Sequence, residues 1–224
     1  MEHTGMGKLL CQMAATIAVL GVICAWNVHR ADERVAAAAA AGAVDLPVIM
    51  YHSILKDEAR AGPYVFSPAA LEADLDYLTH HGYETVTVQM LIDYVDGVGE
   101  LPEKPVLITF DDGFYNNYLY AYPLLQERGM QAVVSVIGEQ TALYTESGQE
   151  NAYWSYLSAG RLAEMQESGV FEIGSHSYAL HDNAGRKGCL KKWGEGRAAY
   201  EALLTQDTQK VQRLLAGAGV TPPG

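Results

Sequence analysis

Residues 106–113 have the sequence VLITFDDG, an apolar stretch rich in β-branched residues that runs into two adjacent carboxylates and a glycine. This composition favours a buried strand. Successive side chains of a strand point to opposite faces, so Asp111 and Asp112 need not share one environment. One of them could bind a metal while the other acts as a base. The alternative interpretation is an Asp-Gly turn with two solvated carboxylates.

Strands and helices are predicted to alternate on both sides of this stretch. Strands are expected near residues 46–51, 83–88, 105–110, 132–137 and 170–175, and helices near 68–81, 89–96, 116–128, 160–168 and 198–217. Ser67-Pro68 has the composition of a helix start. The alternation predicts an α/β fold with a parallel sheet. An open doubly wound sheet and part of a (β/α) barrel, which closes with about seven or eight strands, both fit this pattern.

Two further polar clusters follow predicted strands. Residues 175–181 have the sequence SHSYALH, which contains His176 and His181, and residues 47–52 have the sequence PVIMYH, which ends on His52. Because the carboxyl ends of parallel strands meet at one edge of a sheet, these side chains are expected to converge with the aspartate pair. Two neutral imidazoles and one carboxylate suit Zn²⁺, and also Fe²⁺, Co²⁺ or Ni²⁺. Taken alone, the histidine pair fits surface decoration, and His52 fits a structural histidine at a strand end.

Together, these three segments resemble the NodB-type polysaccharide deacetylases of carbohydrate esterase family 4. Within that family they are similar to the branch that includes the poly-N-acetylglucosamine deacetylases of biofilm matrices. The resemblance covers residues 46–224 and implies a distorted (β/α) barrel. It also implies a metal-dependent hydrolase that removes N-acetyl groups from an acetylated polysaccharide containing N-acetylglucosamine.

The resemblance assigns a role to each candidate site residue. It implies that Asp111 is the catalytic base and that His52 is the catalytic acid. It implies that Asp112, His176 and His181 are the ligands of a divalent metal. Zn²⁺ is the first expectation for that metal, with Fe²⁺, Co²⁺ and Ni²⁺ as alternatives.

The chain departs from the family pattern near its carboxyl end. Family members carry an aromatic-Pro-Tyr motif on a later strand, and no residues after Val220 match it. We therefore expect residues 46–224 to form an incomplete deacetylase domain, a partial (β/α) barrel truncated at its carboxyl end. One alternative to an active deacetylase is a truncated, catalytically inactive remnant tethered to a membrane. A second alternative is a related metallo-amidase or esterase.

The amino-terminal segment predicts a membrane-targeting element. Residues 9–26 carry no charged side chain, and a helix that crosses a bilayer needs about 18–20 such residues. We expect a transmembrane signal-anchor or a signal peptide over residues 1–27, followed by a linker over residues 28–45. The small residues at 36–43 are compatible with cleavage of a signal peptide, so the sequence does not decide between an anchor and a cleaved signal. The chain is thus expected to be membrane-anchored with its catalytic domain extracytoplasmic, or secreted if the segment is cleaved.

Charge and composition narrow the possible partners. The formal net charge is −12, and binding to nucleic acid needs a basic face, so no nucleic-acid partner is expected. Apolar residues make up 49% of the chain, which is enough for a sizeable core. The expected partners are therefore an acetylated polysaccharide and, through residues 9–26, a membrane. The sequence leaves open whether the chain has protein partners.

Overall fold

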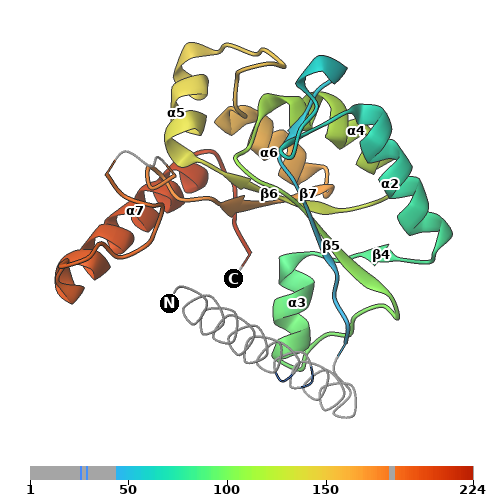
Figure 1. Ribbon diagram of the computed structural model, residues 1–224, viewed down its shortest axis with the longest axis horizontal. Helices are drawn as coiled ribbons and strands as arrows, with labels where there is room; N and C mark the ends of the chain where they lie inside the picture. Colours follow the sequence, from blue (N-terminus) through green and yellow to red (C-terminus); the bar gives the residue numbers. More distant parts are fainter. Residues whose placement is uncertain (1–25, 27–28, 30–43, 182–184, 224) are drawn as a thin grey trace, which may run out of the picture. The chain divides into compact units, whose positions relative to one another are not determined.

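The central sheet of the computed structural model consists of five parallel strands (Figure 1). The strands are β1 (Val48–Tyr51), β4 (Glu84–Thr85), β5 (Pro105–Phe110), β6 (Ala132–Val136) and β7 (Phe171–Ser175). Their order is β1-β5-β6-β7, and β4 pairs with β5. The predicted parallel α/β sheet is confirmed. A barrel stays a prediction, because the strands that the structure describes form an open path with β1 and β7 at its ends.

The structure describes residues 26, 29, 44–181 and 185–223. All the elements considered below lie in the unit Leu46–Gly224. The predicted membrane-targeting segment falls outside the described residues, apart from Trp26, as does most of the predicted linker. Among the described residues, no helix is both long enough and apolar enough to cross a membrane.

Helices connect the strands and cover the sheet. They are α2 (Pro68–His80), α3 (Val88–Val95), α4 (Tyr122–Glu127), α5 (Gly138–Ser147), α6 (Ala159–Glu167) and α7 (Arg197–Gly217), and a single π-helical turn, η2 (Asn117–Ala121), leads into α4. The predicted start of α2 is confirmed: Pro68 is its first residue, and the Ser67 hydroxyl accepts a hydrogen bond of 3.1 Å from the Ala70 amide.

Three short elements and α5 were not predicted. The segment that follows β1 contains the two-residue strands β2 (Ser53–Ile54) and β3 (Val65–Phe66), which pair in parallel, and the 3₁₀ turn η1 (Glu58–Arg60). Strands of two residues are too short to produce a periodic pattern. Helix α5 has the sequence GEQTALYTES, in which apolar residues are too few to mark a buried face.

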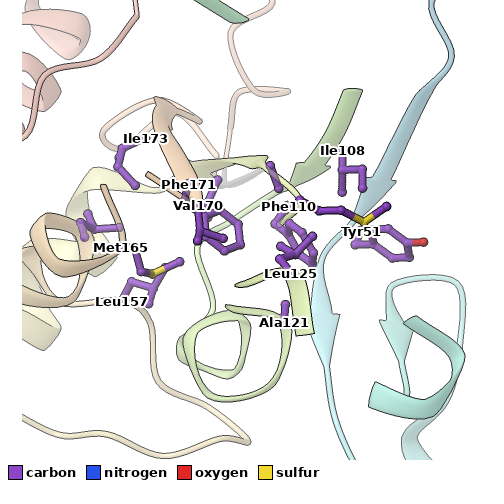
Figure 2. Close-up of a cluster of buried hydrophobic side chains, with 14 of the residues drawn as sticks. Tyr51, Ile108, Phe110, Ala121, Leu125, Leu157, Met165, Val170, Phe171 and Ile173 are labelled. Carbon is purple, nitrogen blue, oxygen red and sulfur yellow. The ribbon is translucent and has the colours of Figure 1, made fainter. Parts of the chain in front are cut away.

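Side chains of the sheet alternate between two apolar layers. Ile108 and Phe110 of β5 point into the larger layer, where they meet α2, α4 and α6, whereas Leu107 packs in the smaller layer beneath α3. Figure 1 shows these helices on the two sides of the sheet, and Figure 2 shows the larger layer. Phe110 stacks on Tyr51 with ring centroids 5.4 Å apart and meets Phe171 edge-on at 5.6 Å. This packing fixes the carboxyl ends of β1 and β5 relative to each other and to the start of β7.

Candidate metal centre

The candidate site lies at the carboxyl ends of three strands. His52 follows β1, the two aspartates follow β5, and His176 follows β7. The strand pairing aligns Tyr51 with Phe110, so His52 and Asp111 leave the sheet at the same level. The predicted convergence of the three sequence clusters at one edge of the sheet is therefore confirmed.

Asp112, His176 and His181 form a compact triad. One ligand atom from each residue lies within 4.8 Å of the others. The Asp112 Oδ1 atom is 3.2 Å from His181 Nε2 and 3.5 Å from His176 Nε2. The two imidazole rings are tilted, with centroids 5.1 Å apart. One carboxylate oxygen and two imidazole nitrogens thus face a common point.

The donor set fits a divalent cation. Asp112 is only 9% exposed, and its Oδ1 atom is buried with no hydrogen-bond partner among the described residues. A buried carboxylate oxygen without a partner is energetically costly, whereas a cation between it and the two imidazoles would satisfy all three groups. Oxygen and nitrogen donors of this kind bind zinc and other first-row transition metals. The triad could therefore hold a divalent metal.

A tight turn after β5 aims the Asp112 carboxylate. Both Asp112 (φ +70°) and Gly113 (φ +76°) adopt the left-handed conformation, which is rare outside glycine. A Cβ atom on Gly113 would lie 2.8 Å from Val136 Cγ1 and 3.3 Å from Val136 Cα. The glycine thus permits both the turn and the close approach of β6.

A Gly113→Ala variant is expected to lose about 2–5 kcal/mol of folding free energy, from backbone strain and from overpacking against β6. Urea unfolding monitored by circular dichroism measures this loss. Gly82→Ala is the matched control, because Gly82 has a nearly equal φ of +74° and a Cβ atom there would meet nothing within 4 Å. Equal losses in the two variants would show that the contact with Val136 is unimportant.

Asp111 and Asp112 occupy different environments. Only Asp112 belongs to the triad. Asp111 is half-buried at the end of the strand, and its amide donates a hydrogen bond of 2.9 Å to the Tyr51 carbonyl oxygen. The two adjacent aspartates therefore do not share one environment, while their roles as ligand and base stay predictions.

His52 opens onto a cleft that also reaches the triad. The cleft has a volume of about 790 Å³, and His52, Asp112 and His181 are among its lining residues. The His52 ring meets Tyr64 edge-on with centroids 5.0 Å apart. Tyr64 and Tyr153, which also line the cleft, are 62% and 51% exposed. The cleft therefore combines two accessible aromatic rings with the polar groups of the site.

Two buried asparagines hold the strand end that carries His52. The Asn117 side-chain amide donates to the His52 carbonyl oxygen at 2.7 Å. Asn116 Oδ1 accepts from the Ile54 amide at 2.9 Å, and Asn116 Nδ2 donates to Ser53 Oγ at 2.9 Å and to the Ala152 carbonyl at 2.8 Å. Sequence reasoning missed both residues; two polar amides at the start of an otherwise aromatic and apolar helical segment were the available signal.

Tyr156 is a further residue that sequence reasoning missed. Its ring stacks on Phe114 with centroids 4.8 Å apart, and it lines a smaller pocket of about 220 Å³ that also includes His181. Burial raises the pKa of the Tyr156 hydroxyl, and the nearby Asp112 carboxylate acts in the same direction. The hydroxyl therefore stays protonated, so it can donate a hydrogen bond beside the triad.

Fold and site together define an α/β protein with a candidate divalent-metal centre at the carboxyl edge of a parallel sheet. Residues 98–222, more than half of the chain, match the polysaccharide deacetylase family, and the chain belongs to that family. The predicted resemblance to NodB-type polysaccharide deacetylases is confirmed.

Individual relatives agree with this assignment. The structure of IcaB from Ammonifex degensii is 32% identical with a TM-score of 0.64, over 79% of this chain and 71% of that one. A Bacillus subtilis relative is 33% identical over 132 residues, 59% of this chain and 42% of its own length. The poly-beta-1,6-N-acetyl-D-glucosamine N-deacetylase of Escherichia coli K12 is 27% identical over 139 residues, 59% of this chain. The match covers 20% of that enzyme, so the chain spans less than half the length of these two relatives.

Proposed function

We propose that this chain is a metal-dependent N-deacetylase that removes acetyl groups from a polysaccharide containing N-acetylglucosamine. The observation that carries the proposal is the triad of Asp112, His176 and His181 at the edge of a cleft that His52 also lines. Membership of the polysaccharide deacetylase family supports the reaction class. The Escherichia coli relative, named for poly-β-1,6-N-acetylglucosamine, supports the sugar.

Asp112, His176 and His181 would hold the cation, for which we propose Zn²⁺ before Fe²⁺, Co²⁺ or Ni²⁺. When bound, the cation supplies Lewis-acid chemistry: it lowers the pKa of the attacking water and stabilises negative charge on the acetyl carbonyl oxygen. Two imidazoles and a single carboxylate would leave coordination positions for water and substrate. The Tyr156 hydroxyl, held protonated, is available as a hydrogen-bond donor beside the site.

Asp111 and His52 are assigned the two proton transfers. Asp111 takes a proton from water as the water oxygen adds to the acetyl carbonyl carbon. The bond between that carbon and the sugar nitrogen then breaks. An amine is a poor leaving group unless it is protonated, and His52 gives the nitrogen its proton. The products are acetate and a free amino sugar.

The cleft has features that suit a sugar chain. Exposed tyrosine rings such as Tyr64 and Tyr153 present flat apolar faces together with polar hydroxyls. The Arg60 guanidinium lies over the Tyr153 ring, 5.2 Å from its centroid.

We also propose that the reaction takes place outside the cytoplasm, with residues 46–224 as the deacetylase domain. The uncharged segment at residues 9–26 supports a membrane anchor with an extracytoplasmic domain, or secretion after cleavage. Such a location would bring the cleft to an envelope or matrix polymer.

Acetate release from the purified chain tests the proposed function. We expect acetate from N-acetylated β-1,6-linked glucosamine oligosaccharides in the presence of Zn²⁺, loss of activity after chelation, and recovery when Zn²⁺ is added back. Acetylxylan carries O-acetyl groups and serves as the control substrate. Acetate from acetylxylan alone would favour the esterase alternative. A chain that binds Zn²⁺ and releases no acetate from either substrate would contradict the proposal and favour the inactive remnant.

A further inference from the structure

The loop that carries both histidines is held from two sides. Ser177, between His176 and His181, has a φ of +70°, a conformation that a non-glycine residue keeps only when its surroundings impose it. On one side, the first amides of α5 donate into the loop: Gly138 to the Ser177 carbonyl at 3.0 Å and Glu139 to the Tyr178 carbonyl at 2.9 Å. These contacts use amides that have no partner within the helix.

On the other side, the loop is held by a buried carboxylate. Asp207 lies in the middle of α7 and is 8% exposed. Its two oxygens accept hydrogen bonds from consecutive backbone amides, Oδ2 from Tyr178 at 2.7 Å and Oδ1 from Ala179 at 2.9 Å. Hydrogen bonds to a charged acceptor are about twice as strong as those between neutral groups.

Contacts within the helix do not account for the burial of Asp207. A buried charge needs partners, and no described Lys, Arg or His forms an ion pair with Asp207. Lys210 lies three residues after Asp207 on α7, but its ammonium group lies over the Tyr178 ring, 5.4 Å from the ring centroid. The two loop amides are therefore what this carboxylate is placed to bind.

We propose that Asp207 is a positioning residue for the metal centre. It fixes the peptide units of Tyr178 and Ala179, which lie between the two histidines in the chain, and thereby sets the separation of the two imidazoles. The inference rests on the proposed metal site but not on the reaction performed there. Groups that orient metal ligands change metal affinity by roughly 10–100-fold when they are removed.

Zinc affinity of the apoprotein tests this role directly. We expect Asp207→Asn to bind Zn²⁺ about 10–100-fold more weakly than wild type, because the side-chain amide can accept from one loop amide only and directs its own N–H groups at the other. Competition with a chromophoric chelator measures the affinity, and circular dichroism verifies the fold. Asp207→Glu keeps the carboxylate and is expected to recover part of the affinity.

Two control variants separate positioning from stability and from charge. Glu201→Gln removes a carboxylate from an exposed ion pair on the same helix and is expected to leave zinc affinity unchanged. Leu215→Ala weakens the packing of α7 at a buried site remote in sequence from the loop contacts. If the affinity of Leu215→Ala falls as much as that of Asp207→Asn, zinc binding follows helix stability and the proposal is wrong. Zinc affinity of Asp207→Asn within twofold of wild type would also overturn it.

Hydrogen exchange on the wild-type protein gives a test that needs no variant to fold. The amides of Tyr178 and Ala179 are expected to be protected in the metal-free protein, since Asp207 holds them before any cation binds. Fast exchange without Zn²⁺ and protection only with Zn²⁺ would overturn the proposal. Zinc affinity and amide exchange do not depend on the reaction. Absence of acetate release by the wild type would therefore contradict the proposed function and leave the proposed role of Asp207 unaffected.

Discussion

An Asp111→Asn variant is expected to keep its Zn²⁺, while its deacetylation rate falls about 10²–10⁴-fold. This factor is the usual contribution of a general base. The substitution preserves the size of the side chain and removes its basicity. Asp111 is outside the triad, so the three ligand atoms should be undisturbed. Metal content by mass spectrometry and acetate release on the same preparation measure the two effects.

The neighbouring residue provides the matched control. Asp112→Asn makes the same chemical change one position along the chain, but it removes the negative charge from the buried oxygen that faces the two imidazoles. We expect this variant to lose Zn²⁺ as well as activity. Near-normal turnover by Asp111→Asn would exclude Asp111 as the base. Loss of Zn²⁺ from Asp111→Asn would instead make it part of the coordination shell.

The sheet and the convergence of the three polar clusters could be predicted because their signals are local, whereas the choice of Asp112 over Asp111 for the triad came from the family resemblance. Residues 106–113 combine an apolar β-branched run with two carboxylates, and each histidine cluster directly follows its own apolar strand. Parallel topology then brings separate strand ends to one edge. These signals alone predict the α/β class, the positions of the five sheet strands in the sequence, and the convergence of the polar clusters at one edge of the sheet.

The supporting contacts could not be predicted because they join distant parts of the chain. Asn116 bonds to Ile54, 62 residues away, and Asp207 bonds to Tyr178, 29 residues away. On the predicted helix, Asp207 lies on the same face as the apolar residues Val211 and Leu215, but that pattern does not show which groups the carboxylate binds. Helix α5, whose first amides hold the histidine loop, has too few apolar residues to be recognised. In each case tertiary contacts, which local periodicity does not report, decide the role of the residue.

A His176→Ala variant is expected to lose stoichiometric Zn²⁺ binding. Four-ligand zinc sites bind with apparent free energies of about 10–16 kcal/mol, so one ligand contributes roughly 3 kcal/mol, or a factor of about 100 in affinity. Titration of the metal-free protein with Zn²⁺ measures the change. Zn²⁺ that binds only the native state should also raise the melting temperature of the wild type and have little effect on the variant.

His80→Ala is the control for this substitution. His80 is an exposed histidine at the end of α2 whose Nδ1 atom contacts the Asp76 carbonyl oxygen at 2.6 Å, so its removal should leave zinc binding unchanged. The His176 side chain is 39% exposed, and its loss should therefore cost the metal-free protein little stability. Stoichiometric Zn²⁺ binding and the rise in melting temperature on addition of Zn²⁺ should then disappear together in His176→Ala. If the variant still binds one Zn²⁺ with unchanged affinity, His176 is not a ligand, and the buried Asp112 oxygen must be satisfied by another group.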